Sequence, residues 1–190
     1  MVNKAVFLDR DGTINFDTGY IGDAEKVELL PGVGKSLAEL KNIYHFKLIV
    51  ISNQSGIARG LITKEQVEQV NNVINAKLKE FNVQIDAFFY CPHHPDFNNE
   101  ELCKCRKPEI GMINEAVNKF NIDLSKSYLI GDSEVDILAA KNAGLKSILV
   151  RTGKGDTSLS ILQNDNNFPS FVAENFSKAA KHIIKDYTGA

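Results

Sequence analysis

Three features are scarce in this sequence of 190 residues: net charge, long apolar runs and cysteine. The formal net charge is only −2, which argues against nucleic acid or a membrane surface as the partner. No run approaches the roughly 18 apolar residues of a membrane span, and the apolar run after Lys4 is too short for a signal peptide. We therefore expect a cytoplasmic protein without a nucleic-acid or membrane partner.

Cysteine occurs three times, at Cys91, Cys103 and Cys105. An odd number within one short stretch suits a reducing compartment and a metal better than a framework of disulfides. With His93, the three thiols form a Cys-x-His and Cys-x-Cys set, which is a closed tetrahedral set of the type used for structural zinc. The sequence therefore predicts a zinc-binding loop over residues 91–105.

Alternatives to this ligand set stay open. His94 could replace His93 or contact the substrate, and the cysteines could be unpaired surface residues. A disulfide between Cys103 and Cys105 is geometrically poor at so short a spacing. Because a zinc ion would have all four ligand positions filled, we expect it to order the loop and to hold the basic residues 106 and 107 in place.

Apolar runs and helical stripes alternate along the chain. Strands are expected over residues 4–9, 46–52, 85–90, 128–130, 147–150 and 171–172, and helices begin near residues 31, 63, 110, 133 and 174. Polar residues 153–168 predict a flexible loop. The repeated strand–helix order predicts an α/β fold with a doubly wound parallel sheet, in a single domain over residues 1–190.

Reactive side chains follow the ends of four expected strands. These residues are Asp9, Ser52, Cys91 and Asp132. In open parallel sheets, ligands bind beyond the carboxyl ends of the strands. We therefore expect these four side chains to lie along one edge of the sheet.

Asp9 and Asp11 stand one residue apart, and Gly12 follows them. A plain turn is the simpler explanation, since Asp and Gly both favour turns. A calcium-binding loop is excluded by its spacing, because Ile14 stands where that loop needs glycine and Tyr20 where it needs the bidentate glutamate. Paired carboxylates at the tip of a buried strand instead indicate a site for a divalent cation, a phosphate or both.

Asp132 is the candidate for a third carboxylate at this site, although Asp132 or Ser133 could also cap the following helix. Carboxylates of Asp9, Asp11 and Asp132 that met without a cation would repel one another. Their convergence would therefore require a divalent ion.

Two further pairs have groups that bind phosphoryl oxygens. Ser52 and Asn53 offer a hydroxyl and loop N–H groups, and Arg106 and Lys107 offer two cations before a helix. Each pair alone is a weak signal, because Ser-Asn is common in turns and basic pairs are usually solvated.

Together these motifs resemble the haloacid dehalogenase-type (HAD) phosphatase superfamily. Its DxDGT motif stands here at residues 9–13, its strand ending in Ser or Thr at Ser52, its lysine at Lys107 and its GDxxxD motif at residues 131–136. All four occur in the family's order within the first 150 residues or so. The resemblance implies a HAD-like Rossmannoid fold.

The resemblance also implies a Mg2+-dependent phosphatase. Asp9 would be the nucleophile that forms an aspartyl-phosphate, and Asp11 would be general acid and then general base. Ser52 and Lys107 would stabilise the transferring phosphoryl group. Mg2+ would bind the Asp9 carboxylate, the Asp11 backbone carbonyl and Asp132, while Asp136 would orient its neighbours.

The cysteine stretch and residues 52–60 narrow the resemblance to the histidinol-phosphatase-like branch, over about residues 5–155. Arg106 would suit a second phosphate, because a planar fork matches phosphate geometry. This chain departs from the branch at Ser133, where the resemblance places a lysine, so one substrate contact differs. The implied substrate-binding residues are Asp17, Thr18, Gly19, Tyr20, Asn53, Gln54, Ser55 and Arg106.

The implied reaction removes the 7-phosphate of D-glycero-D-manno-heptose 1,7-bisphosphate, in the supply of nucleotide-activated heptose for lipopolysaccharide. Short connections after the first and third strands leave no room for a cap domain, so the open site suits a sugar bisphosphate that covers the opening itself. Histidinol phosphate is the alternative substrate, and a non-catalytic zinc-stabilised binding module is a distant alternative that the intact catalytic set argues against. We expect a monomer.

Overall fold

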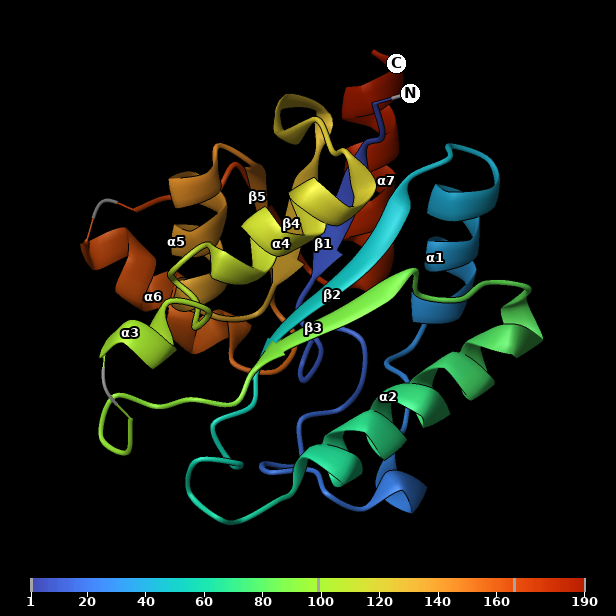
Figure 1. The fold of residues 1–190 in the computed structure, drawn as a ribbon. Helices are drawn as coiled ribbons and strands as arrows, with labels where there is room; N and C mark the ends of the chain where they lie inside the picture. The colour runs from blue at the N-terminus through green and yellow to red at the C-terminus, as the bar shows by residue number, and fades with distance from the viewer. Residues whose placement is uncertain (1, 99, 166, 190) are drawn as a thin grey trace.

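The fold is built on one parallel β-sheet. The computed structural model describes residues 2–98, 100–165 and 167–189. Six strands pair in the order β3-β2-β1-β4-β5-β6, and every pairing is parallel (Figure 1). This arrangement confirms the predicted parallel α/β sheet. The strands are β1 (Ala5–Leu8), β2 (Lys47–Asn53), β3 (Ala87–Cys91), β4 (Tyr128–Gly131), β5 (Lys146–Val150) and β6 (Phe171–Ala173).

Helices cover both faces of this sheet, as Figure 1 shows. One face packs against α1 (Val33–Asn42), α2 (Lys64–Leu78) and α7 (Phe176–Thr188). The other face packs against α4 (Gly111–Phe120), α5 (Glu134–Ala143) and α6 (Gly155–Asn164). The shorter elements are α3 (Glu100–Cys103) and the 3-10 turns η1 (Ala24–Lys26), η2 (Lys79–Phe81) and η3 (Leu124–Lys126).

Alternate residues of β1 enter different hydrophobic cores. Val6 and Leu8 join the core under α1, α2 and α7, while Ala5 and Phe7 join the core under α4 and α5. All four side chains are fully buried. Burial on both faces explains why this strand is a continuous apolar run rather than an alternation of apolar and polar residues.

Two helix boundaries follow from local sequence signals. At the start of α2, the Thr63 side chain accepts from the Gln66 N–H at 3.2 Å, and the Gln66 side chain accepts from the Thr63 N–H at 2.8 Å, which confirms the predicted capping box. Helix α5 ends at Gly144, whose φ of 73° lies in the left-handed region that favours glycine.

The prediction of a flexible loop over residues 153–168 was wrong. Helix α6 occupies much of this range, and Leu162 is buried in a small core with Ile137 and Leu149. These partners come from α5 and β5, so the helix is stabilised by packing against distant elements. The segment was predicted as a loop because it is mostly polar and its apolar residues are sparse. Local composition is a weak guide to a helix that is stabilised by tertiary contacts.

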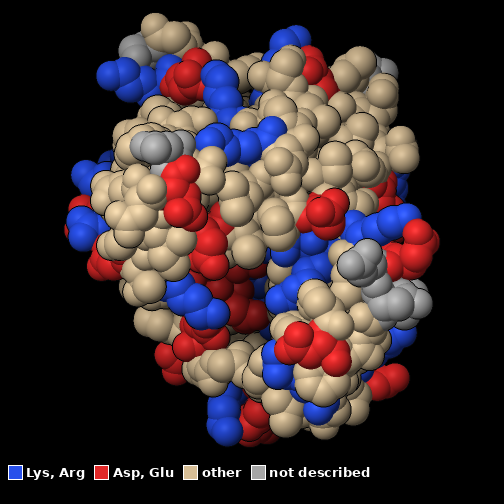
Figure 2. Space-filling model, turned by 90° about the vertical axis from the view of Figure 1, so that its left-hand side faces the viewer, with Lys and Arg blue, Asp and Glu red and all other residues tan. Residues whose placement is uncertain are grey.

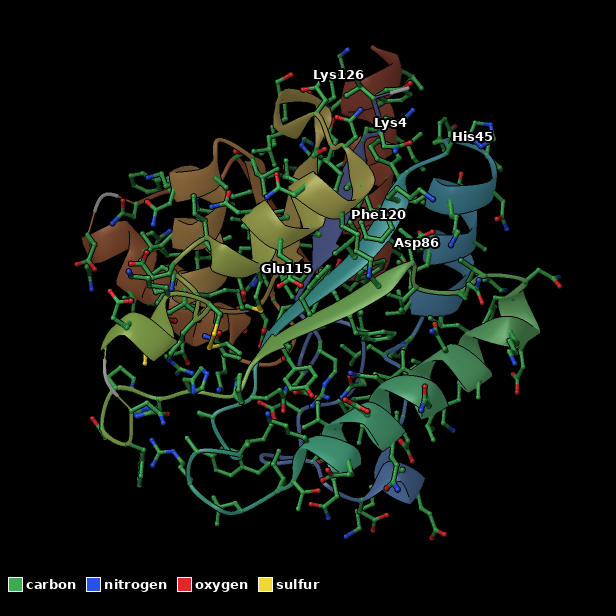
Figure 3. The ribbon with its side chains drawn as sticks, in the orientation of Figure 1. Lys4, His45, Asp86, Glu115, Phe120 and Lys126 are labelled. Atoms are coloured by element: carbon green, nitrogen blue, oxygen red, sulfur yellow. A yellow bond between two sulfur atoms is a disulfide. The ribbon has the colours of Figure 1, made fainter. Side chains whose placement is uncertain are left out.

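The amino ends of the strands carry neutralised charges. Figure 3 labels Asp86 at this end, and its carboxylate accepts from the Leu48 N–H at 2.9 Å. Asp86 also pairs with Lys41 at 3.0 Å and with Lys47 at 3.2 Å.

Within the described ranges, every helix is too short or too polar to span a lipid bilayer.

The strand order determines where a ligand can bind. Strand β1 lies between β2 and β4, so the chain leaves it in one direction and later returns on its other side. Such a reversal opens a crevice at the carboxyl ends of the strands. Asp9 and Asp132 stand directly after β1 and β4, at this crevice.

Candidate active site

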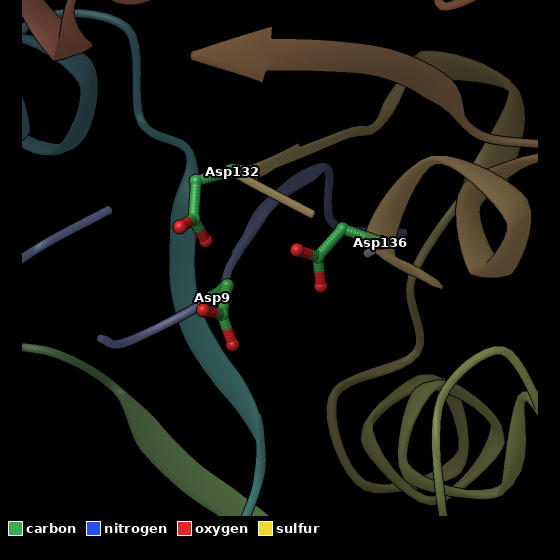
Figure 4. Close-up of side chains that lie close together, drawn as sticks. All are labelled: Asp9, Asp132 and Asp136. Carbon is green, nitrogen blue, oxygen red and sulfur yellow. The ribbon is translucent and has the colours of Figure 1, made fainter. Parts of the chain in front are cut away.

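Three carboxylates converge at the carboxyl ends of β1 and β4. One oxygen atom each of Asp9, Asp132 and Asp136 lies within 4.8 Å of the others. Figure 4 shows the three side chains turned toward a shared space. The structure therefore brings together Asp9 and Asp132, as predicted, and adds Asp136 from the first turn of α5.

Lys107 is the cation at the centre of this group. Its Nζ donates to Asp9 Oδ1 at 2.6 Å, to Asp136 Oδ1 at 2.6 Å and to the carbonyl of Ile51 at 2.8 Å. The side chain is only 2% exposed. Burial alone would lower the pKa of Lys107, but the Asp136 and Asp9 carboxylates raise it above its ordinary value. Lys107 is therefore a permanent positive charge within the site.

Asp136 is fully engaged by protein donors. Its Oδ1 accepts from Lys107, and its Oδ2 accepts from the backbone N–H of Ser133 at 3.1 Å and from the Ser133 hydroxyl at 2.5 Å. Gly131 makes room for this carboxylate, because a Cβ there would lie 2.3 Å from the Asp136 Cγ. Asp136 orients Lys107 and caps α5, so it has little capacity left for a metal ion.

Asp132 is held differently. Its Oδ2 accepts from the backbone N–H of Lys154 at 2.8 Å, and no described side-chain cation lies within ion-pair distance of it. A Cβ at Gly12 would lie 2.3 Å from this same oxygen, so only glycine fits there, and Gly12 also has a φ of 84°. Asp132 is therefore a positioned carboxylate whose charge is left for a ligand.

Burial raises the pKa of Asp9, and although Lys107 opposes this effect, the Asp136 and Asp132 charges add to it. Burial likewise raises the pKa of Asp132, with the Asp136 charge adding to the effect. Three carboxylates converge here and Lys107 pairs with only two of them, so the site has an excess of negative charge. A divalent cation between Asp9 and Asp132 would favour the ionised form of both.

Asp11 is turned toward a set of donors beside the carboxylate cluster. The Arg10 guanidinium donates to Asp11 Oδ2 at 2.7 Å, and Asn15 donates to Oδ1 at 2.9 Å. Gln54 donates to Oδ2 at 3.0 Å. Burial alone would raise the pKa of Asp11, but the Arg10 charge and these hydrogen bonds hold it below its ordinary value. The Asp11 carboxylate therefore lies outside the cluster formed by the carboxylate oxygens of Asp9, Asp132 and Asp136.

A cavity of about 570 Å³ opens over these groups. Figure 2 shows a hollow on one side of the molecule with acidic side chains inside it and basic side chains along its edges. The cavity is lined by Asp9, Asp11, Asp17, Gly19, Tyr20, Ser52, Asn53, Ser55, Arg59, His94, Arg106, Lys107, Asp132, Ser133, Glu134, Val135 and Lys154.

Most of the predicted substrate-binding residues line this cavity. Thr18 and Gln54 do not. Gln54 is buried and donates to the Ser52 hydroxyl at 2.7 Å as well as to Asp11, so it joins the two residues. Asn53 is tied to Lys107 by two hydrogen bonds, at 3.1 and 3.0 Å. Gln54 and Asn53 therefore position catalytic candidates from the loop after β2.

The cysteine stretch differs from the prediction in its pairing. Cys91 and Cys105 form a disulfide with a Cα–Cα distance of 5.4 Å, and Cys103 is free. Among the described residues, no three cysteine or histidine ligand atoms converge, and Asn99 within the predicted loop lies outside those residues. The predicted four-ligand zinc set is thus not assembled. Sequence spacing alone could not exclude this pairing, because the fold brings the ends of the stretch together.

Sequence reasoning missed Arg10, Arg59 and Lys154. Arg10 is 1% exposed, which is unusual for a charged side chain, and its position between two aspartates was the available signal. Lys154 lies between two glycines after β5, which is a typical position for a loop that approaches a ligand. Arg59 gave no comparable signal, since it belongs to an irregular segment after β2.

Comparison with protein families supports a hydrolase. A family model described as HAD-hydrolase-like matches residues 104–179. The chain is 44% identical over 162 residues to the D-glycero-beta-D-manno-heptose-1,7-bisphosphate 7-phosphatase of Haemophilus ducreyi, covering 83% of this chain and 88% of that protein. It is 45% identical over 155 residues to the protein of the same name from Escherichia coli, covering 79% and 80% of the two chains.

A solved structure extends this similarity to the fold. The chain resembles the D,D-heptose 1,7-bisphosphate phosphatase from B. bronchiseptica, which was crystallised with magnesium and phosphate. The two share a TM-score of 0.86 and 31% identity, covering 96% of this chain and 99% of the other.

Proposed function

The chain belongs to the family of HAD-type phosphatases that contains these relatives, and from that premise we propose that it removes the 7-phosphate of D-glycero-D-manno-heptose 1,7-bisphosphate. The product, a heptose 1-phosphate, would be a precursor in the synthesis of nucleotide-activated heptose for lipopolysaccharide. One observation carries the proposal. Identity above 40% to such phosphatases over about four-fifths of the chain coincides with a cavity that gathers Asp9, Asp11, Ser52, Lys107 and Asp132.

Asp9 is the nucleophile in this proposal. Its carboxylate attacks the phosphorus of the 7-phosphate, and the bond from phosphorus to the sugar oxygen breaks. An aspartyl-phosphate and a sugar alkoxide result. The 2.6 Å bond from Lys107 supports this role, because it fixes Asp9 Oδ1 and leaves Oδ2 for attack.

Asp11 is the proton carrier. It gives a proton to the leaving sugar oxygen, and it then takes a proton from the water that attacks the aspartyl-phosphate and releases phosphate. Arg10 and Gln54 hold the Asp11 carboxylate at the cavity wall. Since Arg10 favours the ionised form, Asp11 must move out of this contact or be shielded from it before it acts as an acid.

Ser52 and Lys107 would stabilise charge on the phosphoryl oxygens. The Ser52 hydroxyl accepts from Gln54, so its own hydrogen is free to point into the cavity. Lys107 already spans Asp9 and Asp136 and therefore lies beside the point of attack. Both groups are buried, which strengthens their interaction with developing charge.

The donor set fits Mg2+. Two buried carboxylates, Asp9 and Asp132, face each other with an excess of negative charge, and oxygen ligands are those that Mg2+ prefers. When bound, the ion neutralises charge on the phosphoryl oxygens and the attacking carboxylate. We assign the Asp9 and Asp132 carboxylates and the Asp11 backbone carbonyl as its protein ligands. Asp136 is excluded from this set by its three protein donors.

We also propose that in a reducing cytoplasm Cys91, His93, Cys103 and Cys105 bind a structural zinc ion. The support is chemical: three thiols and an imidazole within 15 residues form a complete ligand set, and the Cys91 and Cys105 sulfurs are already adjacent. Protein purified under reducing conditions should contain about one zinc per chain by mass spectrometry. Zinc-free protein that folds normally and titrates as one free thiol would instead support the disulfide.

Phosphate release across a substrate panel tests the proposed function. The panel holds both anomers of heptose 1,7-bisphosphate, fructose 1,6-bisphosphate and histidinol phosphate, with Asp9→Asn as the inactive control. The heptose bisphosphate should give the highest kcat/KM, and Asp9→Asn should remove activity while circular dichroism stays unchanged. Preference for histidinol phosphate would overturn the substrate assignment, and turnover by Asp9→Asn would overturn the nucleophile. Size-exclusion chromatography and a single unfolding transition would check the expected monomer and single domain.

A further inference from the structure

Arg59 is fixed at the mouth of the cavity by two loops. Its own N–H donates to the Ser55 carbonyl at 3.1 Å, and the preceding Ala58 N–H donates to the Pro92 carbonyl at 3.2 Å. The second bond ties the loop after β2 to the cysteine stretch after β3. The backbone of Arg59 is therefore held by Ser55, which lines the cavity, and that of the preceding residue by Pro92.

The Arg59 side chain is also held in place. One terminal nitrogen lies 3.0 Å from His94 Nε2, and the guanidinium carbon lies 5.2 Å from the centre of the Phe97 ring. The His94 and Phe97 rings pack edge to face with their centres 5.9 Å apart. A guanidinium against an aromatic face loses little of its hydrogen-bonding capacity, because its in-plane N–H groups stay available. The side chain is thus pre-ordered for a ligand.

Arg59 and Arg106 present two like charges to the same cavity. Burial lowers the pKa of Arg106; the Cys103 thiol opposes this effect, and the neighbouring Arg59 charge adds to it. Among the side chains that the structure describes, no carboxylate forms an ion pair with either residue. Two neighbouring guanidinium groups without a counter-ion are unfavourable unless an anion binds between them.

Lys154 also lines the cavity, but it has a carboxylate neighbour. Lys154 Nζ lies 3.9 Å from Asp17, which neutralises part of its charge. Lys107 is neutralised by Asp9 and Asp136 at the floor of the cavity. The excess of positive charge therefore lies on the side of Arg59 and Arg106, while the excess of negative charge lies at Asp9 and Asp132.

We propose that Arg59 is a specificity-determining residue that, together with Arg106, binds the phosphate that is not transferred. The inference rests on the proposed function, because it assumes a substrate with a phosphate at each end. Paired guanidinium groups suit a phosphate dianion, since each provides two parallel N–H donors. Through His94 and Phe97, the cysteine stretch then sets where the second phosphate lies and so discriminates bisphosphates from monophosphates.

The test compares two substrates across three variants. The substrates are heptose 1,7-bisphosphate and heptose 7-phosphate, so the reacting end is the same. The variants are Arg59→Gln, Arg59→Lys and the control Arg151→Gln, which removes a surface guanidinium that pairs with Asp156 outside the cavity. Arg59→Gln should lower the ratio of kcat/KM for bisphosphate over monophosphate by roughly tenfold, mainly through KM. Arg59→Lys should recover part of the ratio, and Arg151→Gln should not change it.

Three other outcomes would overturn the assignment of Arg59. Wild-type protein that prefers the bisphosphate, with the same preference in Arg59→Gln, would overturn the assignment of Arg59 alone. Equal losses for both substrates, through kcat, would also overturn it, because that pattern indicates a general structural role. Wild-type protein that releases no phosphate from the bisphosphate would overturn the proposed function, and this inference with it.

Discussion

Replacing Asp136 with asparagine tests whether this buried carboxylate stabilises the fold through its contact with Lys107. Its side chain is fully buried, and all three of its partners are donors: Lys107 Nζ at 2.6 Å, the Ser133 N–H at 3.1 Å and the Ser133 hydroxyl at 2.5 Å. An asparagine provides one acceptor oxygen only. Its amide nitrogen, a hydrogen-bond donor, would face either the Lys107 ammonium or the Ser133 N–H, which are also donors, so one of these hydrogen bonds would be lost.

The magnitude follows from what remains around Lys107. Breaking a buried ion pair by removing one partner destabilises a protein by about 3–5 kcal/mol. Lys107 would keep Asp9 at 2.6 Å and the Ile51 carbonyl at 2.8 Å, so we expect the lower end, about 3 kcal/mol. Urea unfolding of the metal-free protein at pH 7, followed by circular dichroism, measures this free energy.

The matched control is Asp156→Asn. Asp156 accepts from Arg151 at the same 2.6 Å distance, but its side chain is 67% exposed. Exposed pairs contribute little, so the control should lose less than about 1 kcal/mol. A loss of under about 1 kcal/mol in Asp136→Asn, or equal losses in the two variants, would refute the reasoning that burial makes Asp136 structurally essential.

The pKa of Asp186 is lowered by hydrogen bonds from Lys146 and Tyr128, so its contribution to stability is present at pH 7 and is lost as the pH falls through its folded-state value. In urea unfolding, Asp186→Asn should therefore be less stable than wild type at pH 7 by roughly 0.5 kcal/mol, and the difference should vanish well below about pH 3.9. Leu162→Ala should lower the free energy of unfolding by about 2–4 kcal/mol, because this side chain is 2% exposed under α6; a change near zero would contradict the packing of that helix. EDTA should abolish phosphate release and added Mg2+ should restore it in the same assay, whereas activity that persists in EDTA would contradict the metal assignment.

Much of the fold followed from local patterns. The apolar run of β1, the capping box at Thr63 and the glycine after α5 each depend on residues a few positions apart, so the sequence displays them directly. Helix α6 was missed because its stability comes from packing on α5 and β5, which lie close only after folding. The edge shared by Asp9, Ser52 and Asp132 could be predicted from strand order alone, because parallel strands end on the same side.

Side-chain partners in the site could not be predicted in the same way. Asp11 was expected to act as general acid and base, but the sequence did not indicate that its carboxylate would be paired with Arg10 and Gln54. The cysteine set was expected to close on zinc, yet Cys91 pairs with Cys105. In both cases several partners were chemically acceptable. Which one is reached depends on loop geometry, which is determined by packing rather than by spacing.

The sequence by itself determined the chemistry available to this protein. Carboxylates, a serine and a lysine stand at strand ends and before a helix, and the order of strands brings them to one edge. Only the tertiary structure decided which of these charged side chains are paired within the protein and which are left for a ligand. Asp136 serves Lys107 while Asp132 keeps an unpaired charge, and Arg59 joins Arg106 at the mouth. The physical reason is that burial and long-range contacts, which no local pattern encodes, decide which charges are neutralised and which remain for a ligand.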